Sequence, residues 1–284
     1  MTRRTTSSRF TSITTELYGI SQLQLGTIES IWRYPVKSMR GEEVPHIYTA
    51  YTGLMGDRNY GVVAADGSPG HPWHTGRNQE ELILYTARYQ SDDGLLLPRN
   101  LDASYSEWGP GIDPIYPDAD DFKVSVETTE GKTYDDIQDP AFITDLEKIT
   151  GRSLRVHMTQ RGQFDARPVS LISLSTAAKL GEELGMDIDK RRFRANFYVE
   201  WENQDDAFFE QTLVGKTLKI GDHLELAIVE RDPRCKMITL DPDTADATPK
   251  LLRHLARFHD GNAGVFAAVL QRGRVNKGDP IILK

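Results

Sequence analysis

Short runs of alternating apolar and polar residues, separated by glycine and proline, constrain this chain more than any other feature. Residues 26–34 (GTIESIWRY) alternate in this way and end at Pro35. A period of two places successive side chains on opposite faces, which is typical of half-buried strands. Further runs of strand character lie at 43–51, 58–65, 82–89, 122–128, 154–158, 169–174, 193–201, 216–219, 223–230, 265–270 and 280–283. Strands therefore dominate the predicted fold.

Helical periodicity is confined to three segments. The first covers 140–150, ends before Gly151, and has an apolar face of Phe142, Ile143, Leu146 and Ile149. The second covers 176–184, with Ser175 as its expected N-cap. The third covers 249–258, with an apolar stripe of Leu251, Leu252, Leu255 and Phe258. Few helices among many strands favour a mainly β (α+β) fold, a barrel with appended helices, over an alternating βαβ sheet.

Length and charge set limits on the domains and on the function. A chain of 284 residues corresponds to about two domains. We predict a flexible tail at 1–22 and domains at 23–152 and 153–284. The net charge of -8 argues against a general nucleic-acid binder. No segment reaches the roughly 20 apolar residues of a membrane-spanning helix, so we expect a soluble protein with no transmembrane segment.

The first 15 residues are basic and rich in serine and threonine, and the first acidic residue is Glu16. Two interpretations remain open. The segment is either a disordered polar tail or a mitochondrial targeting peptide, which has a similar composition. We therefore predict a cytoplasmic protein, with a mitochondrial location as the alternative.

Cys235 is the single cysteine, which excludes an internal disulfide and any cluster of cysteine ligands. It follows a predicted strand at Pro233 and lies between Arg234 and Lys236. Cationic neighbours favour a thiolate, which is a nucleophile and a soft metal ligand. The alternative is an inert buried cysteine.

Three loops combine cationic and polar residues next to predicted strands. They contain Lys37-Ser38, Gly56-Asp57-Arg58 and Arg192–Asn196. If these loops converge, they would bind an anionic group through charge-assisted hydrogen bonds. If they do not, each is an ordinary solvated loop.

His71 and His74 are separated by three positions, and a metal clip is conceivable, although no third ligand is evident and Pro72 indicates a loop. The chain has no Walker-type or dinucleotide-type glycine loop. It also lacks the Gly-x-Ser-x-Gly nucleophile motif. A pairing of Cys235 with one of the histidines would depend on the fold.

Six short motifs together resemble those of MOSC-domain proteins. In chain order they are YPVKS (34–38), GDR (56–58), RFRAN (192–196), RC (234–235), TLDPDT (239–244) and GDP (278–280). The pattern is most similar to the amidoxime-reducing component proteins and their bacterial relatives, and it covers about residues 24–284. The resemblance implies a MOSC-type β-barrel preceded by a smaller β-barrel-like N-terminal domain.

The resemblance also implies a molybdenum cofactor, a pterin dithiolene that carries a phosphate and whose metal is bound by Cys235. It implies that Cys235 and Asp241 are catalytic. It further implies that the cofactor is held by Lys37, Ser38, Arg58, Arg194, Asn196, Arg234 and Cys235. Four positions depart from the family pattern: Pro233, Ala195, Ala245 and Phe266. Two of these, Pro233 and Phe266, remove hydrogen-bonding groups near the metal.

From this resemblance we predict a molybdenum-dependent oxidoreductase that reduces N-hydroxylated compounds such as amidoximes or hydroxylamines. A single cysteine cannot hold a four-cysteine iron–sulfur cluster. We therefore expect electrons from a separate protein of the reductase, cytochrome or ferredoxin type. One alternative is a molybdenum cofactor carrier or sulfur-transfer protein that uses Cys235. Another is a β-barrel interaction module without metal.

Overall fold

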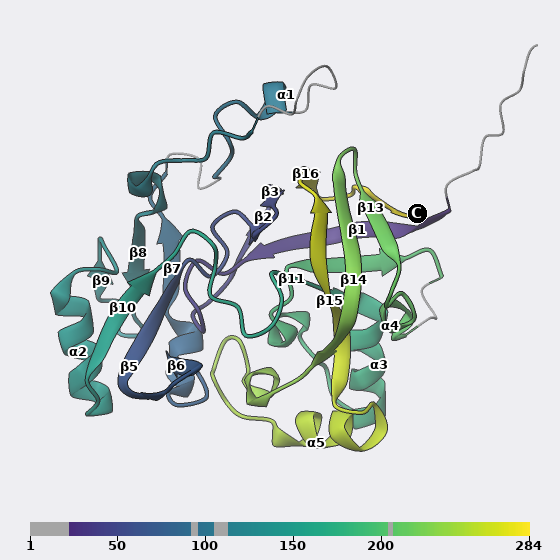
Figure 1. The fold of residues 1–284 in the computed structure, drawn as a ribbon. Coiled ribbons are helices and arrows are strands. Elements are labelled where there is room, and N and C mark those ends of the chain that lie inside the picture. The colour runs from purple at the N-terminus through teal and green to yellow at the C-terminus, as the bar shows by residue number, and fades with distance from the viewer. Residues whose placement is uncertain (1–22, 92–95, 105–112, 204–206) are drawn as a thin grey trace, which may run out of the picture.

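The computed structural model describes residues 23–91, 96–104, 113–203 and 207–284. The predicted tail at 1–22 lies outside this range. Two bodies lie side by side in Figure 1, a β-barrel with three helices and a smaller body of short sheets. The prediction of a mainly β fold with a barrel is confirmed.

Seven strands form the closed barrel of the larger body. Around the barrel they are β12 (Phe197–Trp201), β11 (Val169–Ser173), β15 (Asn262–Gln271), β14 (Leu224–Pro233), β13 (Thr217–Ile220), β17 (Pro280–Leu283) and β1 (Gln24–Arg33). The pair β11–β12 is parallel and the other pairs are antiparallel. The pairing of β12 with β1 closes the barrel and leaves these strands no free edge.

Apolar side chains fill the barrel, as expected for a small one. On β1 the alternation is broken by a register shift between Ile28 and Ser30, which brings both Ile28 and Ile31 into the core. Residues from the other strands complete it, including Leu171, Val199, Leu218, Leu226, Val265 and Ile281.

The first strand of the barrel comes from the far side of the predicted domain boundary. β1 pairs with β12 and β17, so Gln24 lies opposite Ile282. In the other direction, β10 (Leu154–Met158) pairs with β5 (Tyr60–Ser68) of the smaller body. Each predicted domain thus contributes a strand to the sheets of the other, and the division at 152/153 stays a prediction.

The smaller body contains two three-stranded sheets. One has the order β10-β5-β6, with β6 at His71–His74, and the other is β7 (Thr86–Tyr89), β8 (Val124–Glu127) and β9 (Thr133–Tyr134). Helix α2 (Pro140–Thr150) covers them with Phe142 and Leu146. Short strands join this body to the barrel: β2 (Glu42–Val44) pairs with β1, and β3 (His46–Ala50) pairs with β4 (Gly53–Leu54) and β16 (Gly273–Asn276).

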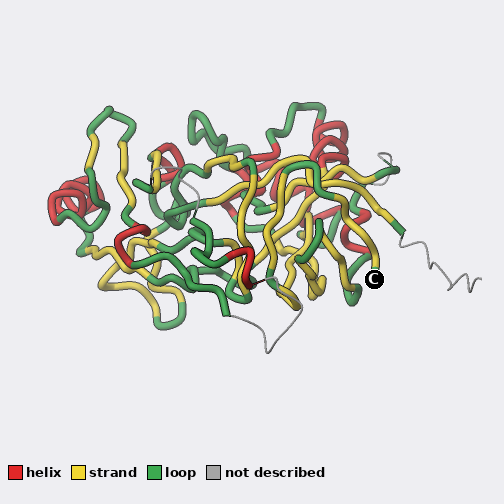
Figure 2. Tube along the Cα trace, turned by 90° about the horizontal axis from the view of Figure 1, so that it is seen from above, coloured by secondary structure: helices red, strands yellow, loops and turns green. Residues whose placement is uncertain are grey.

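Most helices lie at the periphery of the two bodies, as the view from above shows (Figure 2). Helices α3 (Leu174–Leu184) and α5 (Pro249–Phe258) pack against the barrel through Leu180, Leu251 and Leu255. Two short helices, α1 and α4, cover Leu101–Ser104 and Phe209–Thr212. Four 3-10 turns cover Glu80–Leu84 (η1), Ala119–Phe122 (η2), Lys190–Phe193 (η3) and Lys236–Thr239 (η4). In the described residues no helix is long and apolar enough to cross a membrane.

Three predicted strands are shorter than expected. The run 43–51 is interrupted at Pro45, because proline cannot donate a ladder hydrogen bond, and its halves join different sheets. In the run 82–89 only β7 is a strand, since Glu80–Leu84 forms a 3-10 turn. The run 193–201 begins as strand only at Phe197, because η3 and the left-handed residue Arg194 precede it.

Several local expectations were also wrong. Helix α3 is capped by Ser173, whose Oγ accepts from the Thr176 N–H at 3.1 Å, and not by Ser175. The outermost stripe residues are exposed, Ile149 by 65% and Phe258 by 60%. Residues 71–74 form edge strand β6 and not a loop, because an edge strand tolerates Pro72.

Candidate functional site

A cavity of about 360 Å³ brings together every residue predicted to hold the cofactor. The segments that follow β1 and precede β5 contribute to its lining, together with the residues that follow η3 and β14. The predicted residues in its lining are Lys37, Ser38, Arg58, Arg194, Asn196, Arg234 and Cys235. These residues are separated by up to two thirds of the chain, so only the fold unites them.

Three residues of the cavity wall have left-handed backbone conformations. The φ angles are 70° at Ser38, 53° at Arg58 and 51° at Arg194. Non-glycine residues rarely adopt positive φ, and such strained positions cluster at functional sites. In Arg194 this conformation ends η3 directly before β12, where the Arg194 N–H donates to the Arg191 carbonyl.

A fully buried carboxylate, Asp57, holds the two sides of the cavity together. Its Oδ1 accepts from the Tyr34 N–H at 2.8 Å, and its Oδ2 accepts from Asn196 Nδ2 at 3.0 Å. Arg58 Nη1 also donates to Oδ2 at 2.5 Å. Asn196 has its side chain committed to this network, because its Oδ1 accepts from the Ser170 N–H at 3.1 Å. Asp57 thus orients Arg58 and Asn196, although the sequence showed only its place beside Arg58.

Arg194, which lines the cavity, has a buried donor group without a hydrogen-bond partner. Its guanidinium lies 4.3 Å from the Tyr34 ring centroid, and the Arg58 guanidinium lies 4.6 Å from the same ring. Burial lowers the pKa of Arg194 to about 10. Its Nη2 is buried and has no hydrogen-bond partner. A buried unpaired donor is costly, so this atom indicates an absent acceptor.

Lys37 lies at the other end of the cavity and is nearly buried. Its Nζ donates to the Gln163 carbonyl and to Asp165 Oδ1, both at 2.8 Å. Burial lowers the pKa of Lys37. Asp165 also pairs with Arg77 Nη2 at 3.5 Å. Sequence reasoning missed Asp165 and Arg77, because nothing in a polar loop indicates that it turns back onto a lysine far away in the chain.

Cys235 lines the cavity at the start of η4, and its side chain is partly exposed. The cationic neighbours that suggested a thiolate are engaged elsewhere. Arg234 donates to the carbonyls of Ala263 and Phe193 and pairs with Asp232 at 2.8 Å. Lys236 pairs with Glu80 at 2.7 Å. The thiol is accessible to a ligand because it is partly exposed. Both neighbouring cationic side chains, however, are already paired with acidic residues.

Asp232 is a further residue of the cavity wall that sequence reasoning treated only as a partial counter-charge. Its side chain is buried and lies three positions before Cys235. Burial raises its pKa to about 6, although the nearby Arg234 opposes the shift. A carboxyl with a pKa near 6 is suited to proton transfer near neutral pH, although the ion pair with Arg234 favours its charged form.

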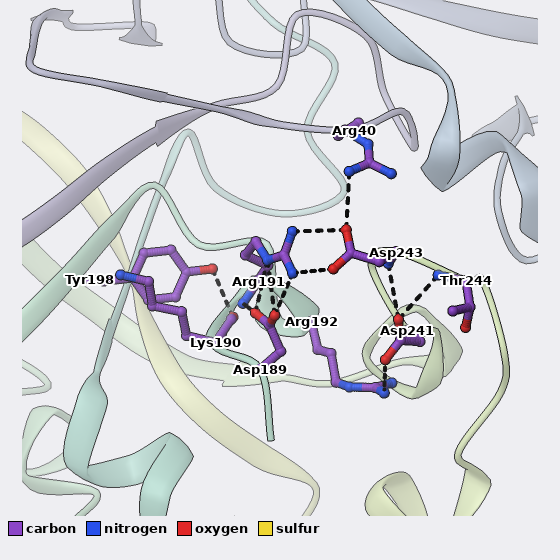
Figure 3. A network of polar contacts seen from close by, with 9 residues as sticks. All are labelled: Arg40, Asp189, Lys190, Arg191, Arg192, Tyr198, Asp241, Asp243 and Thr244. Carbon is purple, nitrogen blue, oxygen red and sulfur yellow. Dashed lines mark hydrogen bonds and ion pairs between the residues drawn. The ribbon is translucent and has the colours of Figure 1, made fainter. Parts of the chain in front are cut away.

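Asp241 does not line the cavity. Figure 3 shows its carboxylate between Arg192 Nη2, at 2.7 Å, and the backbone N–H groups of Asp243 and Thr244. Asp243 reaches across to Arg191 and to Arg40 from the N-terminal segment. The Asp-Pro-Asp-Thr turn thus connects the two bodies through ion pairs. A catalytic role for Asp241 stays a prediction.

His71 and His74 are not brought together as metal ligands. His71 Nε2 contacts Arg77 Nη2 at 2.9 Å, whereas His74 Nε2 contacts Gln79 Oε1 at 3.1 Å.

Of the departures from the family pattern, Pro233 and Phe266 do line the cavity. Ala195 uses the N–H that a proline would lack, because it donates to Tyr198 Oη at 3.2 Å.

Two family models match the chain in sequence. The MOSC domain matches residues 151–282, and the MOSC N-terminal beta barrel domain matches residues 25–137. The chain belongs to the MOSC-domain proteins. The resemblance inferred from the six motifs is therefore confirmed.

Named relatives of this MOSC protein connect the family to molybdenum chemistry. It is 28% identical over 240 residues to mitochondrial amidoxime reducing component 2 of Bos taurus, an alignment that covers 78% of this chain and 68% of the relative. It is 26% identical to the molybdenum cofactor sulfurase of Caenorhabditis briggsae, covering 89% of this chain and only 34% of the sulfurase. Among solved structures, the YUAD protein from Bacillus subtilis matches with a TM-score of 0.45 and 15% identity, over 91% and 94% of the two chains.

The residues of the cavity fit a molybdenum cofactor. Lys37, Arg58 and Arg194 are cationic groups suited to a phosphate, and Arg194 Nη2 lacks an acceptor. Cys235 supplies a soft sulfur ligand. A function related to the molybdenum cofactor thus agrees with both the family and the cavity.

Proposed function

We propose that this protein is a molybdenum-cofactor-dependent oxidoreductase that reduces N-hydroxylated compounds. The observation that supports the proposal is that one thiol lines a single cavity together with the cationic Lys37, Arg58 and Arg194, and that Arg194 has an unsatisfied guanidinium donor. The relatives named amidoxime reducing components support the substrate class. An amidoxime is one such substrate, and its reduction consumes two electrons and two protons and releases water.

Each group in the cavity has a distinct role in this reaction. Lys37, Arg58 and Arg194 bind the anionic part of the cofactor, and Asp57 keeps Arg58 in place. Cys235 binds the metal through Sγ. When bound, the cofactor supplies the two-electron redox chemistry. Asp232 lines the cavity wall, and the protonated form of its carboxyl can supply a proton to the departing oxygen.

Substitution of the thiol tests the proposal. Cys235→Ser offers a harder and far less acidic oxygen, so we expect loss of amidoxime reduction, while cofactor bound through the cationic residues remains. X-ray absorption at the molybdenum edge should show one fewer sulfur neighbour in the variant than in the wild type. Equal sulfur counts in the two proteins, or full reductase activity in the serine variant, would show that Cys235 is not the ligand.

A second candidate function is that of a cofactor carrier or sulfur-transfer protein, as the sulfurase relatives suggest. Purified protein with bound molybdenum cofactor and an artificial electron donor separates the two. Turnover of benzamidoxime supports the reductase. Absence of turnover, together with transfer of cofactor or sulfur to an acceptor protein, supports the carrier.

The electron donor in our proposal is a separate redox protein of the reductase, cytochrome or ferredoxin type. The net charge of -8 suits a basic partner, because opposite charges accelerate encounter. The relatives are named as mitochondrial, which favours the mitochondrial alternative for the location. A strong decrease of the reduction rate with ionic strength would support such docking.

A further inference from the structure

Two histidines and one glutamate form a cluster on the helical side of the barrel. Glu183 lies in the last turn of α3, His254 in α5, and His259 is the residue that ends α5. None of them lines the cavity around Cys235. Helices α3 and α5 are in contact beneath the barrel in Figure 1, so the cluster connects two helices.

The three side chains already point to one place. The Nε2 atoms of His254 and His259 each lie 2.7 Å from the same Oε2 of Glu183. The possible ligand atoms of Glu183, His254 and His259 all lie within 4.8 Å of one another. The side chains are 24% (Glu183), 15% (His254) and 17% (His259) exposed; the two histidines are half-buried, Glu183 is an exposed residue, and the cluster is reachable from solvent.

Aromatic contacts hold both imidazole rings in these orientations. His259 stacks on Phe208 with a centroid distance of 4.3 Å and an interplanar angle of 17°. His254 lies 4.8 Å from the ring of Phe258. Fixed rings reduce the ordering entropy that a bound ion would otherwise have to overcome.

Two of the three distances between ligand atoms require little change to accept a metal ion, and the third, between the two imidazole nitrogens, is at most 4.8 Å. With metal–ligand bonds of about 2.0–2.1 Å, the ligand atoms of a tetrahedral site lie about 3.3 Å apart. Each Nε2–Oε2 distance would therefore lengthen by about 0.6 Å, which a rotation of the Glu183 side chain provides. Two imidazole nitrogens and one carboxylate oxygen suit zinc, whereas magnesium and calcium prefer oxygen ligands alone.

We propose that Glu183, His254 and His259 bind a divalent transition metal, zinc in preference, with water as the fourth ligand. The ion links the end of α3 to α5. Leu251 and Leu255 of α5 pack with Ile238 of η4, the turn that follows Cys235. A metal here would therefore stiffen the helix that supports the cavity wall, while it takes no part in the reaction.

Cobalt provides the most direct test, because tetrahedral Co²⁺ absorbs visible light much more strongly than the hydrated ion. The metal-free full chain is titrated with Co²⁺, and Zn²⁺ is then added to displace it. We expect one equivalent of strongly absorbing Co²⁺, which is lost in His254→Gln and in His259→Gln. Glu183→Gln should weaken binding at least as much as the 10–100-fold that loss of an outer-shell partner costs.

Three control variants distinguish this site from other ligands. Glu182→Gln changes the residue before Glu183, which pairs with Lys179, and His157→Gln changes an exposed histidine on β10. Cys235→Ser removes the cavity thiol. All three should keep the cobalt spectrum. Circular dichroism and the Tm in chelator confirm that each variant is folded, and Zn²⁺ should raise the Tm of the wild type but not of the histidine variants.

Three results would overturn the proposal. The first is a wild-type protein that takes up neither Co²⁺ nor Zn²⁺. The second is a cobalt spectrum that persists in both histidine variants. The third is a spectrum that disappears in Cys235→Ser, which would place the ion in the cavity. None of these readouts depends on reductase activity, so the metal site and the proposed function are tested independently of each other.

Discussion

Replacing Asp57 by asparagine should destabilise the fold strongly, although the two side chains have nearly the same shape. Asp57 is fully buried and accepts hydrogen bonds from the Tyr34 N–H, from Arg58 and from Asn196. In either orientation the new amide turns an NH₂ group toward at least one of these donors. Arg58 also loses its buried counter-charge. Breaking a buried ion pair on one side costs about 3–5 kcal/mol, which we expect as the loss in free energy of unfolding.

Urea denaturation of the cofactor-free protein measures this loss, with Asp66→Asn as the matched control. Asp66 also pairs with an arginine, Arg152 at 2.6 Å, but its side chain is 69% exposed. An exposed pair contributes about 0–1 kcal/mol, so the control should unfold almost like the wild type. A cost below about 1 kcal/mol for Asp57→Asn would refute the claim that Asp57 holds the cavity together.

Three further predictions concern the cavity, the backbone and pH. Arg194→Ala should weaken cofactor binding by about 1.5–3 kcal/mol, measured as molybdenum occupancy, whereas the exposed Arg253→Ala should leave it unchanged. Gly56→Ala should lower the free energy of unfolding by about 2–5 kcal/mol, because its Cβ would lie 2.9 Å from Leu96 and Tyr89. Gly131→Ala has the same left-handed backbone in open space and should lower it by only about 1–2 kcal/mol. Burial raises the folded-state pKa of Asp232 from 3.8 to about 6. Its contribution to stability is therefore full below pH 4 and falls by about 3 kcal/mol as the pH rises through 6. Asp232→Asn should flatten this part of the wild-type pH–stability profile, and an unchanged profile would contradict the shift.

Local patterns predicted the elements well where neighbouring residues determine them. Helices α2 and α5 have the predicted bounds, because a proline begins each of them and their apolar periods lie within the segments themselves. Strand β10 likewise matches its alternating run. By contrast, the run 43–51 is divided at Pro45 between two sheets, and the strands that its halves pair with, β1 and β16, can be known only from the fold.

The candidate site depended on tertiary contacts and was less accessible to sequence reasoning. The motifs named the cationic residues around the cavity, but their meeting was inferred from the family and not from spacing. Arginine carries no sequence signal for the left-handed conformation of Arg194, which η3 and β12 impose together. A buried aspartate such as Asp57 looks like any surface acid in a Gly-Asp-Arg loop, because burial is decided by segments far away.

Closure of the barrel also has a consequence for synthesis of the protein. Strand β1 needs both β12 and β17 as partners, and β17 is the last described strand to be made. At about 5–20 residues per second, the roughly 250 residues between β1 and β17 take about 12–50 s to translate. During that time β2 and then β12 become available to β1, but the edge that pairs with β17 has no partner yet. Unpaired strand edges promote association with other chains, so this edge of β1 is a point of association until Pro280–Leu283 has been made.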